Sequence, residues 1–165
     1  MKHIKIFSFT ICCMLLFTTC ASMKAPIIQQ FESIDTYKYV FITPTTEVTY
    51  SSSGIFGGTY GVIGASSKRT INPSDVITGI LLKQGYIRLP ELNPELLDKT
   101  LIVNYGESGT RKVNLGTSKE ITIQFLSART YKPICVCTAE GQGSTEVDDI
   151  RIAINRALGP LFNNK

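Results

Sequence analysis

Two glutamates near strand ends are the residues of this chain best placed for acid–base chemistry. Glu107 follows the predicted strand 100–105, and Glu140 follows the predicted strand 133–138. If these strand ends meet, the two carboxylates oppose each other and can serve as general acid and general base. The alternative is that both are solvated groups, because carboxylates often end strands for solvation alone. We expect the second case, and therefore a protein that is not an enzyme.

Histidine chemistry is excluded by the position of the one histidine. His3 lies in an N-terminal segment that has the features of an export signal and would be lost from the mature protein. Without it, no Ser–His or Cys–His pair and no histidine-ligated metal site can form. We therefore expect neither a metal nor a cofactor.

Cys135 and Cys137 are the cysteines that would stay in the folded domain. Two residues apart on a strand, they point to the same face. Their spacing is not C-x-x-C, and a disulfide between them requires the strand to buckle, because bridge geometry is strict. We expect two small apolar core residues, with a disulfide in an oxidising compartment as the alternative.

The N-terminal segment predicts export. A basic start is followed by a mostly apolar run of 12 residues over 6–17 and then by Thr18-Thr19-Cys20. This is the order of a secretory signal peptide, and the run is shorter than the roughly 20 residues that span a bilayer. Residues 17–20 resemble the lipobox of bacterial lipoproteins, which implies lipid attachment at Cys20 after removal of 1–19. The alternative is an ordinary signal peptide cut near Ala21 or Ala25.

Charge argues against nucleic acid as a partner. Removal of the signal takes away two of the 17 basic residues and leaves 146 residues with a net charge of +2. That length suits one domain with a sizeable core. Nucleic-acid binding usually requires a basic stripe with aromatic residues, and no basic cluster is longer than the pairs Lys68-Arg69 and Arg111-Lys112.

Capping residues predict two helices. Asn72, Pro73 and Asp75 indicate a helix start, and Gly85 indicates its left-handed end. A second helix is predicted to begin at Ser144 or Thr145, because three acidic residues follow in the first turn. Gly159-Pro160 is expected to end it.

Runs rich in β-branched and aromatic residues predict five strands. They lie at 36–44, 86–89, 100–105, 118–128 and 133–138. A turn or bulge is expected at 106–109, and residues 129–132 are expected to connect a hairpin. The resulting order, β-α-β-β-β-β-α, predicts an α+β fold, with a mixed sheet and two helices packed on one of its faces.

Residues 48–67 form an unusual insertion. These 20 residues carry no charge and include five glycines. Three interpretations are open: a segment packed on the domain's own sheet, a partner-binding loop, or a membrane-inserted hairpin with arms of about 9–11 residues. The candidate partner-binding residues are Ile55, Phe56, Tyr60, Val62 and Ile63.

Three stretches resemble a family of small envelope lipoproteins. They are 76–86, which ends in Leu-Lys-Gln-Gly-Tyr, the strand 101–105, and the strand–hairpin–strand region 121–141. Over residues 36–161 the chain is similar to domains related to the N-terminal domain of the TolB translocation protein and to the curli secretion lipoprotein. The hairpin 129–133 lacks the glycine common in relatives. The resemblance implies a fold and an envelope role, and it supplies no catalytic residues.

These observations together predict a domain plan and a function. We expect a signal peptide at 1–19, a lipidated cysteine and tether at 20–33, and a single domain at 34–165 with its insertion at 48–67. The expected protein is anchored in the outer membrane on the periplasmic side and docks an envelope protein or a glycan. The alternative is an oligomeric pore or secretion-channel subunit that inserts the 48–67 hairpin.

Overall fold

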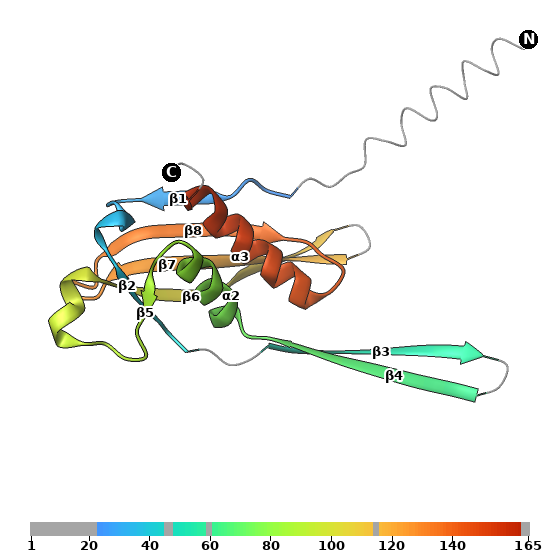
Figure 1. The fold of residues 1–165 in the computed structure, drawn as a ribbon. Coiled ribbons are helices and arrows are strands. Elements are labelled where there is room, and N and C mark those ends of the chain that lie inside the picture. Colours follow the sequence, from blue (N-terminus) through green and yellow to red (C-terminus); the bar gives the residue numbers. More distant parts are fainter. Residues whose placement is uncertain (1–22, 45–47, 59–60, 114–115, 163–165) are drawn as a thin grey trace, which may run out of the picture.

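The computed structural model describes residues 23–44, 48–58, 61–113 and 116–162 (Figure 1). Six strands form a mixed sheet in the order β1-β8-β7-β6-β2-β5, and β3 and β4 form a separate two-stranded sheet. The predicted α+β class is confirmed. The elements are β1 (Ile27–Gln30), η1 (Ile34–Thr36), β2 (Tyr39–Ile42), β3 (Val48–Gly58), β4 (Gly61–Ile71), α2 (Pro73–Lys83), β5 (Ile87–Arg88), η2 (Pro94–Lys99), β6 (Thr100–Val113), β7 (Gly116–Ser127), β8 (Pro133–Gly141) and α3 (Glu146–Phe162).

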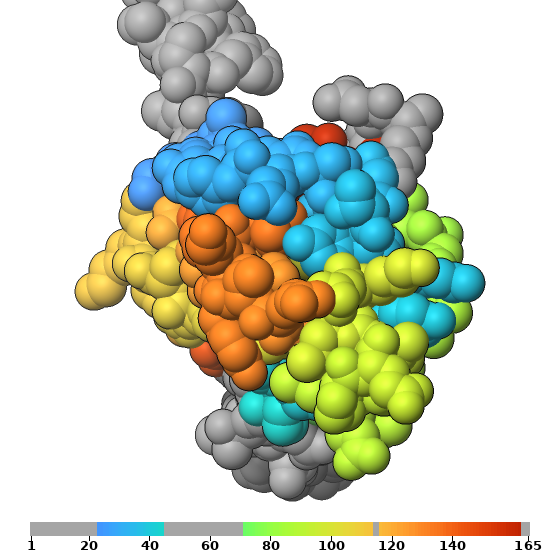
Figure 2. Space-filling model, turned by 90° about the vertical axis from the view of Figure 1, so that its left-hand side faces the viewer, coloured from blue at the N-terminus to red at the C-terminus, as the bar shows by residue number. Residues whose placement is uncertain are grey.

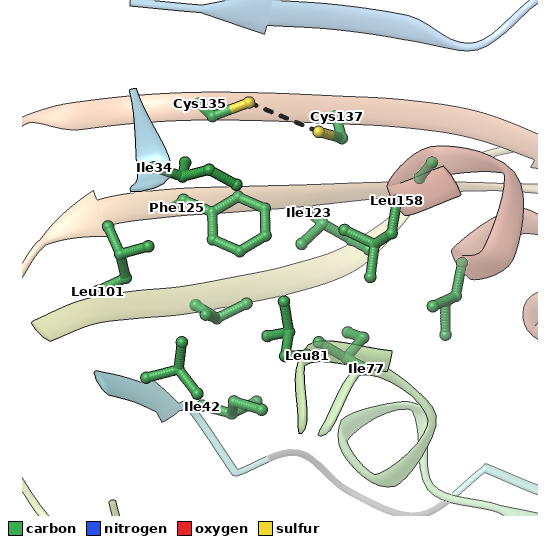
Figure 3. Packing of buried hydrophobic residues seen from close by; sticks show 14 of the residues in the cluster. Ile34, Ile42, Ile77, Leu81, Leu101, Ile123, Phe125, Cys135, Cys137 and Leu158 are labelled. Carbon is green, nitrogen blue, oxygen red and sulfur yellow. Dashed lines mark hydrogen bonds between the residues drawn. The ribbon is translucent and has the colours of Figure 1, made fainter. Parts of the chain in front are cut away.

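Both helices cover the same face of the six-stranded sheet (Figure 1). Helix α3 packs on β7 and β8, and α2 packs against α3 and β5. The core fills the space between these layers (Figure 3). On β7 the predicted alternation is confirmed, because Ile121, Ile123 and Phe125 are buried whereas Thr122 and Gln124 remain partly exposed.

Local capping explains where the helices begin. The Asn72 side chain accepts a hydrogen bond from the Ser74 N–H at 3.0 Å, and Thr145 Oγ1 accepts one from the Asp148 N–H at 3.2 Å. Gly85 has the left-handed φ of 88° that its position after α2 predicted. Both predicted helix starts are confirmed.

Helix α3 does not end at Gly159-Pro160 as expected, and continues to Phe162. A proline lacks the N–H that would continue the helical ladder. Packing compensates, since the Phe162 ring is buried and lies 6.3 Å from the Tyr86 ring, measured between centroids. The last turn therefore stays helical because it contributes to the core.

Strand β6 is longer than predicted. Of the turn or bulge expected at 106–109, the bulge is observed, with a register shift between Glu107 and Gly109, and pairing with β7 resumes up to Val113. The Ser108 side chain donates to the Glu120 carbonyl across the bulge at 3.3 Å. The long β6–β7 ribbon brings Arg111 and Lys112 into the structured domain.

Residues 27–30, expected within the tether, form the edge strand β1. They pair antiparallel with β8, with Ile27 opposite Thr138 and Gln30 opposite Cys135. Without β1, the backbone groups along the outer edge of β8 would lack strand partners, which leaves a sheet edge open to unwanted pairing. The N-terminal segment is therefore part of the sheet.

Candidate functional site

The β3–β4 hairpin holds four of the five predicted partner-binding residues. Ile55 and Phe56 lie on β3, and Val62 and Ile63 lie on β4. The register places Phe56 opposite Ile63, close to the distal end of the hairpin. Tyr60 and Cys20 lie outside the described residues.

The register also assigns the residues of this hairpin to two faces, because strand residues alternate between faces. Phe56 shares one face with Ile63, and Ile55 shares the other with Val62. Apolar residue types therefore occur on both faces at the distal end. Nearer the middle, serines predominate on both strands.

The hairpin is separate from the main sheet. Among the described strands, β3 pairs with β4 alone, and the ribbon extends beyond the end of the six-stranded sheet (Figure 1). The insertion therefore adds no strand to the six-stranded sheet, and its three interpretations stay open. The outer backbone edges of β3 and β4 have no strand partner in the described part of the chain.

A buried carboxylate organises the end of the sheet near the start of β1. The Glu140 side chain is 3% exposed and accepts two hydrogen bonds from Arg111, from Nε to Oε1 and from Nη2 to Oε2, both at 2.8 Å. Ser118 Oγ donates a third to Oε1 at 2.6 Å. Such a two-pronged ion pair is strong and sets a definite geometry. It ties β6, β7 and β8 together.

Glu140 also binds the chain just before β1, at Lys24. The Lys24 backbone N–H donates to Glu140 Oε2 at 3.1 Å. Arg156 on α3 donates from Nη2 to the Lys24 carbonyl at 2.8 Å and from Nη1 to the Glu140 carbonyl. The Lys24 ammonium lies 3.6 Å from Glu120. We call Lys24, Arg111, Glu140 and Arg156 the N-terminal clamp.

The clamp keeps the Glu140 carboxylate ionised. The hydrogen bonds from Arg111 lower its pKa most, those from Ser118 and Lys24 add to the effect, and together they outweigh burial, so the pKa falls to about 2. For Glu107, burial raises the pKa, but hydrogen bonds from Thr110 and Lys119 outweigh it and the net pKa is lowered. Neither carboxyl group is suited to hold a proton near neutral pH.

The alternative that Glu107 and Glu140 oppose each other as a catalytic pair is not observed, and the expectation that both are solvated is wrong for Glu140, which is buried. Strand β7 lies between β6 and β8, so the two strand ends are not neighbours. Each carboxylate has its own cation: Lys119 Nζ lies 2.9 Å from Glu107, and Arg111 holds Glu140. The geometry is that of structural ion pairs.

Sequence reasoning missed the clamp residues Lys24, Arg111 and Arg156. Arg111 was missed because residues 106–109 are predicted as a turn or bulge and no strand is predicted directly after them. Lys24 was placed in a tether, and Arg156 was considered only as a helix residue. One signal was present: Glu140 directly follows Ala139 in a run of small and apolar residues, and a carboxylate in such a strand requires a buried partner.

A cavity of about 620 Å³ lies beside the start of α3, between the β6–β7 ribbon and residues 142–149. Its buried carboxylate, Asp149, accepts a hydrogen bond from the Gly143 N–H at 2.5 Å. Burial raises the Asp149 pKa. Asp148 accepts hydrogen bonds from the Ser144 and Thr145 hydroxyls. These carboxylates occupy the positive end of helix α3, where negative charge is favoured.

The two core cysteines are buried thiols. Cys135 and Cys137 are both 0% exposed, and their sulfur atoms are 3.6 Å apart, hydrogen-bonded and not joined (Figure 3). The hydrogen bond with Cys135, together with burial, raises the pKa of Cys137. The prediction that both are small core residues on one strand face is confirmed.

Within the described ranges, no group of three or more His, Cys, Asp or Glu side chains is placed to hold a metal ion. In the same ranges, the helices are too short or too polar to cross a membrane.

Among the comparisons with known proteins, matches were found to solved structures. No protein-family model and no curated protein matches the chain. One similar structure is a dodecamer of a PelC variant from Paraburkholderia phytofirmans, with 12% identity, a TM-score of 0.46, and coverage of 85% of this chain and 99% of that one. A second PelC dodecamer from the same organism has 11% identity and a TM-score of 0.42, and covers 82% of this chain and 96% of that one.

Proposed function

We propose that this chain is a non-enzymatic, lipid-anchored protein of the outer membrane that docks an envelope partner on the periplasmic side. The observation that carries the proposal is the β3–β4 hairpin, which forms a two-stranded sheet separate from the six-stranded one and contacts the rest of the domain at α3. The resemblance to envelope lipoproteins in three sequence stretches supports the same role.

The hairpin has the properties of a contact element. Each strand has 11 residues, so the ribbon is roughly 36 Å long at 3.3 Å per residue. Residues 48–67 carry no charge, so a partner does not have to strip water from ionised groups. An apolar tip with unpaired strand edges can bind a protein groove or accept an added strand.

The proposed anchor raises the efficiency of docking. Lipid attached at Cys20 would hold the domain on the membrane, where several acyl chains give durable attachment and a single chain does not. A tethered hairpin then meets a membrane partner at a high effective concentration. The partner we propose is an envelope protein or a glycan.

Crosslinking in living cells tests the docking role. With a photoreactive residue at Phe56, we expect a discrete adduct with another cell component, because the distal end is apolar on both faces. The control is the same probe at Lys132, an exposed residue directly before β8. Equal adducts at both positions, or none at Phe56, would contradict the proposal.

A Cys20→Ala variant tests the anchor. We expect it to leave the membrane fraction almost entirely while its urea-unfolding curve stays that of the parent, because the hydrophobic core is built from residues 28–162. Membrane fractionation and circular dichroism measure the two properties. If the variant stays with the membrane, or if it loses its fold, the modular anchor is refuted.

A second candidate function is an oligomeric pore or secretion-channel subunit. Strand length favours it, since 11-residue arms match the 9–11 residues of transmembrane strands. Residue pattern disfavours it, since a barrel wall needs one apolar and one polar face, whereas the distal end is apolar on both. In the Phe56 crosslinking experiment, a ladder of self-adducts in place of one discrete band would favour the pore.

A further inference from the structure

We propose that the face of the six-stranded sheet opposite the helices binds a neutral oligosaccharide, which lies across β6, β7, β8 and β1. This inference goes beyond the docking role of the hairpin, because it concerns a different surface and does not depend on a lipid at Cys20. We call this surface the open face. Its defining residues are Ile27, Gln29, Asn104, Thr122, Gln124, Val136 and Thr138.

Strand alternation assigns these residues to the open face. On each of the four strands, residues that pack in or against the core mark the face that the helices cover; they include Ile28, Val103, Ile123 and Cys137. The neighbours of these residues in the sequence therefore point away from the helices. The open-face side chains of β6, β7 and β8 are partly exposed, and those of β1 are exposed.

The register arranges the open face in rows that cross the strands. Gln124 lies opposite Asn104 on one side and opposite Val136 on the other, and Val136 lies opposite Gln29. Neighbouring strands are about 4.8 Å apart, so the row from β6 to β1 spans roughly 14 Å. This length suits a short oligosaccharide better than a single sugar.

The three amide side chains of this row are available to a ligand. Among the described residues, Gln29, Asn104 and Gln124 have no side-chain hydrogen-bond partner. Each amide offers N–H donors and a carbonyl acceptor, and a sugar hydroxyl can use both. In the adjacent row, the Thr122 and Thr138 hydroxyls share a hydrogen bond of 2.9 Å and keep acceptor lone pairs. The open face therefore matches a hydroxyl-rich ligand.

The charge of the open face selects a neutral ligand. None of its defining side chains is ionisable. Beyond the threonine row, the charged groups are already paired: the Lys24 ammonium lies 3.6 Å from Glu120, and Arg111 binds Glu140. A charged sugar would lose part of its hydration on this surface without gaining an oppositely charged partner.

Apolar side chains lie at the border of the open face and not at its centre. Ile27 and Phe31 are 57% and 60% exposed, and the Phe31 N–H, directly after β1, donates to the Ile134 carbonyl at 2.9 Å. Figure 2 shows this end of the sheet, with the N-terminal residues in blue beside the β7–β8 connection in orange. An exposed aromatic ring can cover the C–H face of a sugar. Protein interfaces have the reverse order, an apolar centre and a polar rim, so the arrangement favours a glycan.

Binding to immobilised oligosaccharides tests the proposal. The full-length protein is purified from membranes in an amine-oxide detergent, because a detergent with a sugar headgroup would compete for the open face. It is then titrated against neutral, acidic and amino-sugar oligosaccharides. We expect binding to a subset of the neutral ones, and a loss of affinity of about tenfold in Gln124→Ala, which removes hydrogen bonds at the centre of the row. Binding to none of the neutral oligosaccharides, or a preference for charged ones, overturns the proposal.

Gln29→Ala and Gln30→Ala are a matched pair, because these adjacent glutamines lie on opposite faces of β1. The Gln30 side chain already donates to the Glu32 carbonyl at 3.2 Å. We expect Gln29→Ala to weaken binding and Gln30→Ala to bind as the parent does. Equal affinities of the two variants would overturn the proposal.

Sedimentation of the sugar-free protein tests a second copy of the chain as the occupant. Self-association that Gln29→Ala abolishes would make the open face a protein interface and overturn the glycan. Photocrosslinking from Phe56 reports on the hairpin independently, so the docking role and the glycan site can fail separately.

Discussion

Replacement of Gly141 with alanine should lower the free energy of unfolding by about 3 kcal/mol or more, because the added methyl group has no space. A Cβ at Gly141 would overlap the Asp149 carbonyl oxygen and the Ala153 nitrogen, and would lie 3.0 Å from the Ala153 Cβ. Two of these three atoms are backbone, so a rotamer change cannot relieve the overlap. Helix α3 would have to move away from β8, and the core between them would open.

The matched control is Gly106→Ala on β6. A Cβ there meets nothing within 4 Å, and an alanine in place of glycine at a compatible position stabilises by about 0.4–1 kcal/mol through the unfolded chain. Urea unfolding followed by circular dichroism measures both variants. If Gly141→Ala is as stable as the parent protein, then α3 does not pack on β8 at this glycine.

The second large effect is expected from Glu140→Gln. The folded-state pKa of Glu140 is about 2, against an ordinary value of 4.5. A lowered carboxyl pKa stabilises the folded state above the ordinary value, and the contribution disappears as the pH falls from 4.5 towards 2. At 1.36 kcal/mol for each pKa unit, the contribution at neutral pH is on the order of 3 kcal/mol.

The Glu140→Gln variant should therefore be less stable at pH 7 and should lose less stability than the parent on acidification. It keeps the size of the side chain, but it removes the charge that Arg111 binds and replaces one acceptor oxygen with an amide group that can only donate. Urea midpoints between pH 7 and pH 3 measure the difference. The control is Glu91→Gln in an exposed loop, which should follow the parent curve. Identical curves for both variants would contradict a buried ion pair at Glu140.

Glu140 and Gly141, which are adjacent on β8, show how this strand connects the fold with the proposed function. Glu140 fixes the N-terminal segment, and the adjacent Gly141 admits the backbone of α3. The chain that would lead to the lipid and the helix that covers the core therefore meet at one strand end. Damage at Glu140 is expected to change both the stability and the attachment of the N-terminal segment to the sheet, whereas damage at Gly141 acts through the core.

Sequence reasoning succeeded where a feature depends on residues within about four positions. The cap of α2 joins Asn72 to Ser74, and the cap of α3 joins Thr145 to Asp148. The alternation on β7 follows from the pleat of a single strand. Such features are local in the chain, so residue type alone was sufficient to predict them.

Tertiary structure decided everything that depends on distant partners. Strand β1 forms because it can pair with the edge of β8, which is more than 100 residues later in the sequence. Strand β7 separates Glu107 from Glu140, because it lies between β6 and β8 in the sheet. The clamp joins Lys24, Arg111 and Glu140 from three parts of the chain. The sequence by itself determined the α+β class, the helix caps and the uncharged insertion, since these follow from local backbone preference and periodicity. The edge strand, the separate hairpin and the clamp required the packed fold, because only the fold brings their donors and acceptors within hydrogen-bond distance.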